Sequence, residues 1–413
     1  MSTVSCFGES WGSPWGLCVE RGWKGLPLKI LLVASPPFEE IGGVSTHVRM
    51  LSGGLQALGE TVHVIGEQPP RIYRAPLVSL PGLLLYKTSR RLGRRWDLAT
   101  RHLYYLVKGF LATGFSPDVI NVQDATHMPM AVHLKRLTGC QVVLTVHGFL
   151  ADEAEESGTC VRGDALWTWL RDLETRGYRD ADQIIAVSSS AAAYVDEFAH
   201  APISVIHSGI DTLMFSPCPA GAYRRSQVES GLRLLFAGFL EPHKGVLDAV
   251  EVLVRLREAG ISAELIVAGE GSEREPGRHM AEQRNIADHI SWLGAVKKSD
   301  MPAFYRMGEV LLMPSKPRGS GGGEEPFPYT ALEAMASGLP VIAYDVGGLS
   351  EQIKDGSTGF IVPLGDIRAM VTASETLVDL EIRRGMSAMA RERIESDFSA
   401  LGMARKFVSV YNQ

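Results

Sequence analysis

The sequence predicts an α/β protein of two domains, each a parallel β-sheet covered by helices, which face each other across a cleft. Short, nearly continuous apolar runs recur along the chain, each followed by a helical pattern, and this is typical of strands buried on both faces of a parallel sheet. A stretch rich in Pro, Gly and Ser at residues 209–231 separates the runs into two sets. A chain of 413 residues is long enough for two such domains.

The predicted strands follow each other in order. In the first half they are LKILLVA (28–34), TVHVI (61–65), DVINV (118–122), QVVLTV (141–146), QIIAVS (183–188) and ISVIH (203–207). In the second half they are LRLLFAG (232–238), AELIVAG (263–269), EVLLMPS (309–315), PVIAYD (340–345) and GFIVP (359–363). After Gly43, the spacing of Val48, Leu51, Leu55 and Leu58 predicts a helix with one buried face.

These elements divide the chain into four parts. We expect residues 1–27 to be an extension without fixed structure, because they lack the charged start and apolar core of a signal peptide and precede the first strand. Residues 28–208 and 209–393 are predicted to form two Rossmann-like domains, and residues 394–413 a helix that crosses back to the first domain. Because ligands of such sheets bind beyond the carboxyl ends of the strands, the functional residues are expected there.

The composition excludes several classes of protein. A net charge of −6 argues against nucleic-acid binding by the molecule as a whole. No apolar run approaches the roughly 20 residues of a membrane-spanning helix. The five cysteines include no pair at C-x-x-C spacing, so we expect neither a zinc site nor a disulfide framework, and free thiols suit a reducing cytoplasm.

One segment departs from the acidic balance. Residues 71–110 contain nine Lys or Arg and one acid, interleaved with aromatic and leucine side chains. Four of its arginines stand close together, at Arg90, Arg91, Arg94 and Arg95. Such a stretch favours a surface for anionic lipid or for a phosphorylated acceptor. The alternative is a solvated helical hairpin whose arginines face water.

Two motifs of the first half place useful groups at strand ends. Gly42 and Gly43 precede the first helix, where the backbone can approach a ligand closely and where Ser45 or Thr46 can cap the helix. His147 follows strand 141–146, at the edge where such sheets carry functional side chains. The alternatives are an ordinary strand-to-helix turn and a histidine that only caps a strand.

Two further motifs lie in the second half. Lys244 follows the first strand there, in a loop where its ammonium can neutralise a phosphate, although an ordinary turn lysine is the alternative. Thr330 and Glu333 match a capping box, which by itself explains Glu333. The box does not explain Glu325, which lies between a glycine-rich stretch and two prolines. Glu325 is therefore the stronger candidate for binding a ligand.

In combination these motifs resemble the retaining glycosyltransferases of family four, which have the GT-B fold. The resemblance rests on the order of the glycine pair, His147, Lys244 and the E-x7-E pair Glu325 and Glu333. It also rests on VIHSGID (205–211) and ASGLPVIAYDVGGLSEQIKDGSTGFIV (336–362). It extends from residue 28 to the C-terminus and is strongest over residues 203–363.

The resemblance implies a nucleotide-diphosphate sugar donor that lies in the cleft, mostly against the second domain. Glu325 would hold hydroxyls of the donor sugar, and Glu333 would accept from the ribose hydroxyls. The helix N-terminus at Thr330 would face the diphosphate. Lys244 would neutralise the diphosphate as it leaves.

The first domain is implied to hold the acceptor. His147 would contact the donor sugar near the reacting centre, and Gly42 and Gly43 would let this domain close on the diphosphate. The family retains the anomeric configuration, and a front-face substitution assisted by the leaving phosphate is the usual scheme. No cofactor and no metal is expected.

Two departures from the family stand out. The family commonly has Gly-Arg-Leu where this chain has Phe239 in the central position, so one cation toward the diphosphate is missing. A charged hydrogen bond of this kind is worth about 1.5–3 kcal/mol. Lys316 or Arg318 are candidate replacements. They belong to the second departure, a long glycine-rich loop that we expect to order over the donor.

The sequence thus predicts a retaining hexosyltransferase that acts on a carbohydrate acceptor, lipid-linked or phosphorylated. A non-catalytic protein of the same fold that binds a nucleotide or a glycan is an alternative, supported by the missing arginine. A sugar-nucleotide epimerase is another, although the placement of the two glutamates counts against it. We expect a cytoplasmic protein, held at the inner face of the membrane by residues 71–110.

Overall fold

The computed structural model describes residues 26–34, 42–66, 84–85, 87–89, 91–93, 96, 114, 116–217, 231–317 and 327–413. Most of the expected N-terminal extension lies outside these residues. So do five of the predicted site residues, namely Arg90, Arg94, Arg95, Arg318 and Glu325.

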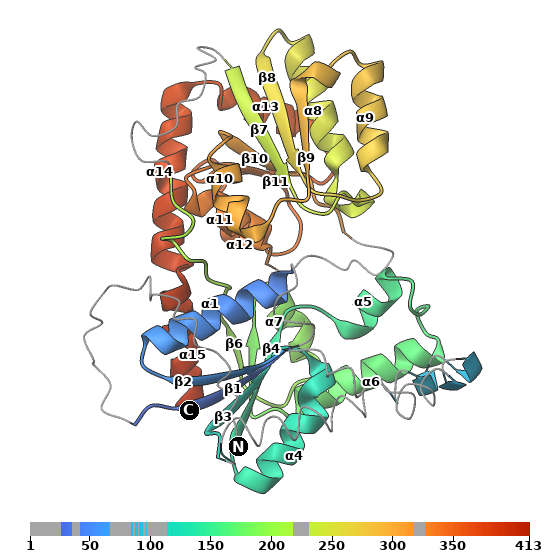
Figure 1. Ribbon diagram of the computed structural model, residues 1–413, viewed down its shortest axis with the longest axis vertical. Helices are drawn as coiled ribbons and strands as arrows, with labels where there is room; N and C mark the ends of the chain where they lie inside the picture. The colour runs from blue at the N-terminus through green and yellow to red at the C-terminus, as the bar shows by residue number, and fades with distance from the viewer. Residues whose placement is uncertain are drawn as a thin grey trace, which may run out of the picture.

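Two six-stranded parallel sheets form the two domains, which confirms the predicted fold class (Figure 1). The N-terminal sheet has the order β2-β1-β3-β4-β5-β6, and the C-terminal sheet has the order β12-β11-β10-β7-β8-β9. The N-terminal strands are β1 (Lys29–Val33), β2 (Thr61–Ile65), β3 (Val119–Val122), β4 (Gln141–Val146), β5 (Gln183–Ala186) and β6 (Ile203–Val205). The C-terminal strands are β7 (Gly231–Ala237), β8 (Ser262–Ala268), β9 (Ile290–Gly294), β10 (Val310–Met313), β11 (Val341–Tyr344) and β12 (Gly359–Val362).

Helices cover both faces of each sheet, as buried parallel strands require. In the N-terminal half they are α1 (Gly43–Ala57), α4 (Met128–Thr138), α5 (Leu150–Glu156), α6 (Ala165–Asp180) and α7 (Ser189–Asp196). In the C-terminal half they are α8 (Val246–Glu258), α9 (Arg274–Gln283), α10 (Met301–Tyr305), α11 (Tyr329–Ala336), α12 (Leu349–Gln352), α13 (Ile367–Thr376), α14 (Leu380–Asp397) and α15 (Ala400–Tyr411). Short 3-10 turns include η2 (Ala125–His127), η3 (Pro242–Lys244), η4 (Ala287–His289) and η5 (Lys298–Asp300).

The strands explain why each sheet has two cores. Along β1, Leu31 and Val33 pack into one hydrophobic cluster, while Ile30 and Leu32 pack into the other, because successive side chains point to opposite faces. The sequence did not predict β9, which lies at the edge of its sheet. Its Leu293 is 44% exposed, so β9 lacks the continuous apolar run of the other strands.

The last helix of the chain packs against the N-terminal domain, whereas α14 runs along the side of the C-terminal domain (Figure 1). Phe407 of α15 is fully buried in the same cluster as Ile30. At Gly54 of α1, an added Cβ would lie 2.8 Å from the backbone oxygen of Ala400, so the two helices approach closely only because this residue is glycine. The chain therefore passes between the domains twice.

The two passages lie side by side. The backbone N–H of Ile210 donates to the carbonyl of Phe398 at 2.8 Å, and the N–H of Ala400 donates to the carbonyl of Ile210 at 2.9 Å. These bonds tie residues 209–211 to the junction between α14 and α15. In the described part of the chain, no helix has the length and apolarity needed to cross a membrane.

Candidate functional site

A cavity of about 280 Å³ lies between the two domains, at the carboxyl ends of their strands. The N-terminal domain contributes the first turn of α1. The C-terminal domain contributes the segments that follow β7 to β10 and the start of α11. Five predicted site residues line it together: Gly42, Gly43, Lys244, Thr330 and Glu333.

The two glycines leave open space at the mouth of α1. A Cβ added to Gly42 or Gly43 would meet no protein atom within 4 Å, so the room beside them belongs to the cavity. Neither Ser45 nor Thr46 caps the helix, and that expectation is wrong. Thr46 Oγ1 instead donates to the carbonyl of Gly42 at 2.9 Å and accepts from Lys298 Nζ, of the C-terminal domain, at 2.5 Å.

The predicted capping box at Thr330 and Glu333 is also wrong. Helix α11 begins at Tyr329, two residues earlier than the box requires, and Pro328 takes the cap position without a side-chain hydrogen bond. With Pro328 at the cap, the third helical position is Ala331, so Glu333 lies two residues too far along the helix to accept from the N–H of the cap residue, which a proline also lacks. Glu333 accepts from the hydroxyl of Tyr305 at 2.9 Å instead. The capping box therefore does not explain Glu333.

Glu333 is a buried carboxylate at the meeting of the domains. Burial raises its pKa to about 7, and this is opposed by the Tyr305 hydrogen bond and by the positive charges of Lys298 and Arg49. Arg49 belongs to α1, so cations of both domains act on this one group. Burial also lowers the pKa of Lys298, to about 8.

The candidate replacement cation Lys316 does not line this cavity. Its Nζ lies 2.9 Å from Asp248 Oδ1, and the hydroxyl of Tyr344 donates to the other oxygen of Asp248 at 2.7 Å. Lys298 was missed by the sequence reasoning, because nothing in GAVKKSD distinguishes it from Lys297. Phe239, which stands at the arginine position, lines the cavity and is 59% exposed.

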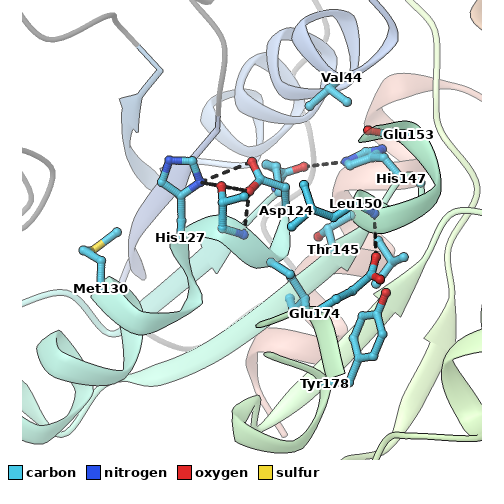
Figure 2. Close-up of a pocket in the computed structure, with 16 residues that line it drawn as sticks. Val44, Asp124, His127, Met130, Thr145, His147, Leu150, Glu153, Glu174 and Tyr178 are labelled. Atoms are coloured by element: carbon cyan, nitrogen blue, oxygen red, sulfur yellow. Dashed lines mark hydrogen bonds and ion pairs between the residues drawn. The ribbon is translucent and has the colours of Figure 1, made fainter. Parts of the chain in front are cut away.

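His147 lines a second cavity, of about 240 Å³, within the N-terminal domain (Figure 2). Val44 lines this second cavity, next to Gly43 of the first, so the first turn of α1 contributes to both. Burial lowers the pKa of His147 to about 4, although the negative charge of Asp124 opposes the shift. The imidazole is therefore neutral at physiological pH.

A buried chain of hydrogen bonds orients His147. Gln123 donates through Nε2 to Asn121 Oδ1 at 2.7 Å, which leaves its Oε1 to accept from His147 Nε2 at 2.8 Å. Asn121 in turn donates to the hydroxyl of Tyr411 at 2.7 Å. The proton of the neutral imidazole thus sits on Nε2, and Nδ1 is left as an acceptor. The network connects the last turn of α15 to His147.

The second cavity is rich in carboxylates. Asp124, Glu153 and Glu174 line it, and the described lining residues include no Lys or Arg. The backbone N–H of Leu150 donates to Glu174 at 2.6 Å, and burial raises the pKa of Glu174 to about 7 (Figure 2). Carboxylates accept hydrogen bonds from hydroxyl groups, so this cavity suits a polyol or a sugar.

Other predicted features contribute little to these cavities. Of the four arginines near residue 90, only Arg91 is described, and it is exposed. Across the described residues, no group of three or more His, Cys, Asp or Glu is arranged to hold a metal ion.

Comparison with known proteins identifies both halves of the chain. The family model "Glycosyl transferases group 1" matches residues 224–393, and the model "Glycosyltransferase Family 4" matches residues 41–212. Glycogen synthase of Mycobacterium tuberculosis (strain CDC 1551 / Oshkosh) is 28% identical over 407 residues, which cover 93% of this chain and 94% of that protein.

A second relative and a solved structure extend the comparison. The GDP-mannose-dependent alpha-(1-6)-phosphatidylinositol monomannoside mannosyltransferase of the same organism is 31% identical over 202 residues, 48% of this chain and 52% of that protein. The structure of sucrose-phosphate synthase from Thermosynechococcus elongatus matches with a TM-score of 0.70 and 19% identity, over 93% of this chain and 98% of that one. This likeness confirms the GT-B fold.

The buried Glu333 generates a prediction for stability. The raised pKa means that the folded protein holds this proton more tightly than the unfolded chain, so the stability due to Glu333 falls from about pH 4.5 to about pH 7. A Glu333→Gln variant has no carboxyl group to ionise at this position, so its stability does not decrease for this reason as the pH rises. We therefore expect its melting temperature, relative to wild type, to rise from about pH 5 to about pH 7.

The exposed Glu381→Gln change is the control for this measurement, since Glu381 makes only a surface ion pair with Arg384. Its difference from wild type should stay flat over the same pH range. A flat or falling difference for Glu333→Gln would show that the carboxylate is not desolvated in the folded protein.

Proposed function

This chain belongs to family four of the glycosyltransferases, and we propose that it moves a hexose from a nucleotide-diphosphate sugar to a hydroxyl-bearing acceptor with retention of the anomeric configuration. The observation that carries the proposal is the cavity between the domains, where Gly42, Gly43, Lys244, Thr330 and Glu333 come together from distant parts of the chain. The family provides the class of reaction, and the cavity provides groups suited to each part of such a donor.

The donor's charged part would meet two features of the C-terminal domain. Lys244 ends the 3-10 turn η3 and lines the cavity, where its ammonium can lie against a phosphate. No side chain caps α11 at Pro328, so the first N–H groups of this helix, at Tyr329 and Thr330, suit the same anion. The diphosphate would therefore lie between Lys244 and the start of α11.

The donor's neutral parts would meet carboxylates. Glu333 lines the cavity beyond Thr330 on α11 and can accept from two adjacent hydroxyls, which suits a ribose. Glu325 lies outside the described residues and keeps its proposed role of holding the donor sugar, on the strength of the E-x7-E spacing. His147, neutral and with Nδ1 as an acceptor, would contact the sugar from the N-terminal domain.

The proposed chemistry leaves the proton with the substrates. The bond between the anomeric carbon and the diphosphate oxygen breaks while the acceptor oxygen attacks from the same face. The acceptor's proton passes to an oxygen of the departing diphosphate. Without a protein nucleophile, the main task of the protein is to stabilise the charge on the leaving diphosphate, which falls to Lys244 and α11. The proposal includes no resident cofactor or metal.

The acceptor is proposed to be a carbohydrate, free or lipid-linked, whose hydroxyls enter the second cavity. Its carboxylates Asp124, Glu153 and Glu174 are suited to hydroxyl groups. It adjoins the cavity between the domains, which we call the donor cavity, through the first turn of α1. The mannosyltransferase relative is named for a phosphatidylinositol monomannoside. An acceptor of that class would combine sugar hydroxyls with a lipid anchor.

One observation favours a second candidate, a protein that binds the nucleotide without turning it over. Phe239 lines the cavity where the family commonly has an arginine. A non-catalytic protein of this kind would bind nucleoside diphosphates and release no sugar from any donor.

Turnover separates the two candidates. We expect the wild-type protein to hydrolyse at least one donor of a panel of UDP-, GDP- and ADP-sugars, or to transfer its sugar. NMR of the product should show that the α-configuration of the donor sugar is retained. Lys244→Met should lower kcat about 10²–10³-fold, the usual effect of losing one group that stabilises a leaving anion. Glu325→Ala should lower turnover as well.

Lys354→Met is the matched control, because Lys354 is exposed and lies outside both cavities. Equal kcat for wild type and Lys244→Met would remove Lys244 from the mechanism. Tight nucleotide binding without turnover of any donor would support the non-catalytic alternative instead.

Peripheral attachment to the inner face of the membrane is part of the proposal, with residues 71–110 as the contact. The support is the local excess of positive charge in an otherwise acidic chain, together with the lipid in the name of the mannosyltransferase relative. Basic segments near an anionic surface gain about 1 kcal/mol for each Lys or Arg.

Vesicle flotation tests this attachment. We expect the protein to float with vesicles containing phosphatidylglycerol at low salt and to stay in solution with neutral phosphatidylcholine vesicles. High salt should release it, because the attraction is screened. Charge reversal of Arg90, Arg91, Arg94 and Arg95 to Glu should abolish flotation. Flotation that survives charge reversal would locate the contact elsewhere.

A further inference from the structure

Lys298 is a cation that lines the donor cavity and whose ammonium can donate further hydrogen bonds. It begins the 3-10 turn η5 after β9 and is half-buried. Its Nζ donates to Thr46 Oγ1 at 2.5 Å, and no described carboxylate lies within ion-pair distance of it. An ammonium has three N–H donors, so two remain for a ligand.

Neither described acid of the cavity forms an ion pair with Lys298, although the negative charge of Glu333 acts on it from a longer distance. Glu270 pairs with Arg274, and Glu333 accepts from the hydroxyl of Tyr305. Burial and the nearby positive charge of Arg49 lower the pKa of Lys298 to about 8, and the negative charge of Glu333 opposes the shift, so the side chain is mainly protonated at neutral pH. A half-buried cation that has lost part of its solvation and lies near a second positive charge is stabilised when an anion binds beside it.

The position of Lys298 matches the expected position of the diphosphate. Thr46, which accepts from its ammonium, itself donates to the carbonyl of Gly42 at 2.9 Å. The hydroxyl of Thr46 therefore links Lys298 to the N-terminal turn of α1, where Gly42 and Gly43 leave room for a ligand. The positive end of the α1 dipole favours an anion at the same place.

The other candidates are less well placed. Lys316 forms an ion pair with Asp248 and does not line the cavity. Phe239 lines the cavity and carries no charge. We propose that Lys298 binds the donor diphosphate and supplies the positive charge that Phe239 does not. This inference rests on the proposed function, because it assigns one more residue to the same donor site.

The test compares ligands with and without phosphates. Binding of UDP, GDP and ADP, and of uridine, guanosine and adenosine, is measured by calorimetry for wild type, Lys298→Met and Lys316→Met. For the base that the protein prefers, Lys298→Met should weaken the diphosphate about 10- to 100-fold, as expected for one charged hydrogen bond, and leave the nucleoside unchanged. Lys316→Met should change neither.

Restoring the arginine provides a second arm. Phe239→Arg, introduced into Lys298→Met, should recover most of the lost affinity for the diphosphate, because Phe239 is largely exposed to the same cavity. Melting temperatures of all variants establish that each is folded. Recovery by Phe239→Arg without a change in nucleoside affinity would support a shared phosphate role.

The binding measurements distinguish a failure of the Lys298 inference from a failure of the proposed function. An equal loss for nucleoside and diphosphate in Lys298→Met, or no loss for either, overturns the inference while the donor site stands. A wild-type protein that binds none of the three diphosphates overturns the proposed function and the inference together.

Discussion

A parallel sheet ends all of its strands at one edge, and in this protein two such edges face each other. Every group assigned to the donor follows from this constraint. Lys244 comes after β7, Lys298 after β9, and Glu333 from the helix that follows β10, so three distant segments reach one cavity. The first turn of α1 closes the cavity from the other domain. Because the site belongs to neither domain alone, it exists only while the two domains hold this arrangement.

The C-terminal helix maintains that arrangement. Helix α15 returns to the N-terminal domain, where Gly54 permits a backbone approach that any larger residue would prevent. From there Tyr411 begins the buried hydrogen-bond chain that ends at His147. The helix that joins the domains therefore also sets the tautomer of His147, which lines the second cavity. At the interface itself, Lys298 and Arg49 offset part of the cost of burying Glu333.

The sequence predicted the fold well because buried parallel strands are nearly continuous apolar runs. Among the described residues, it predicted eleven of the twelve strands and missed β9, whose exposed Leu293 breaks the pattern. At the site, motifs showed which residue types follow which strands, and they include five of the residues that line the cavity between the domains. The hydrogen-bond and ion-pair partners of individual side chains could not be predicted as well from the sequence. The predicted capping box is wrong because α11 begins two residues earlier, at Tyr329, which moves Glu333 out of the third helical position. Lys298 carries no local signal that separates it from Lys297.

The central claim is that a nucleotide-diphosphate sugar occupies the cavity between the domains, and Gly42 tests it most directly. The backbone of Gly42 is extended, with φ of 179°, and a Cβ added there would meet no protein atom within 4 Å. Calorimetric titration of Gly42→Val with the nucleoside diphosphate that wild type prefers is the measurement. We expect an unchanged melting temperature and a loss of binding of at least tenfold, about 1.4 kcal/mol. Full affinity in the folded variant would contradict it, because the diphosphate would then lie somewhere else.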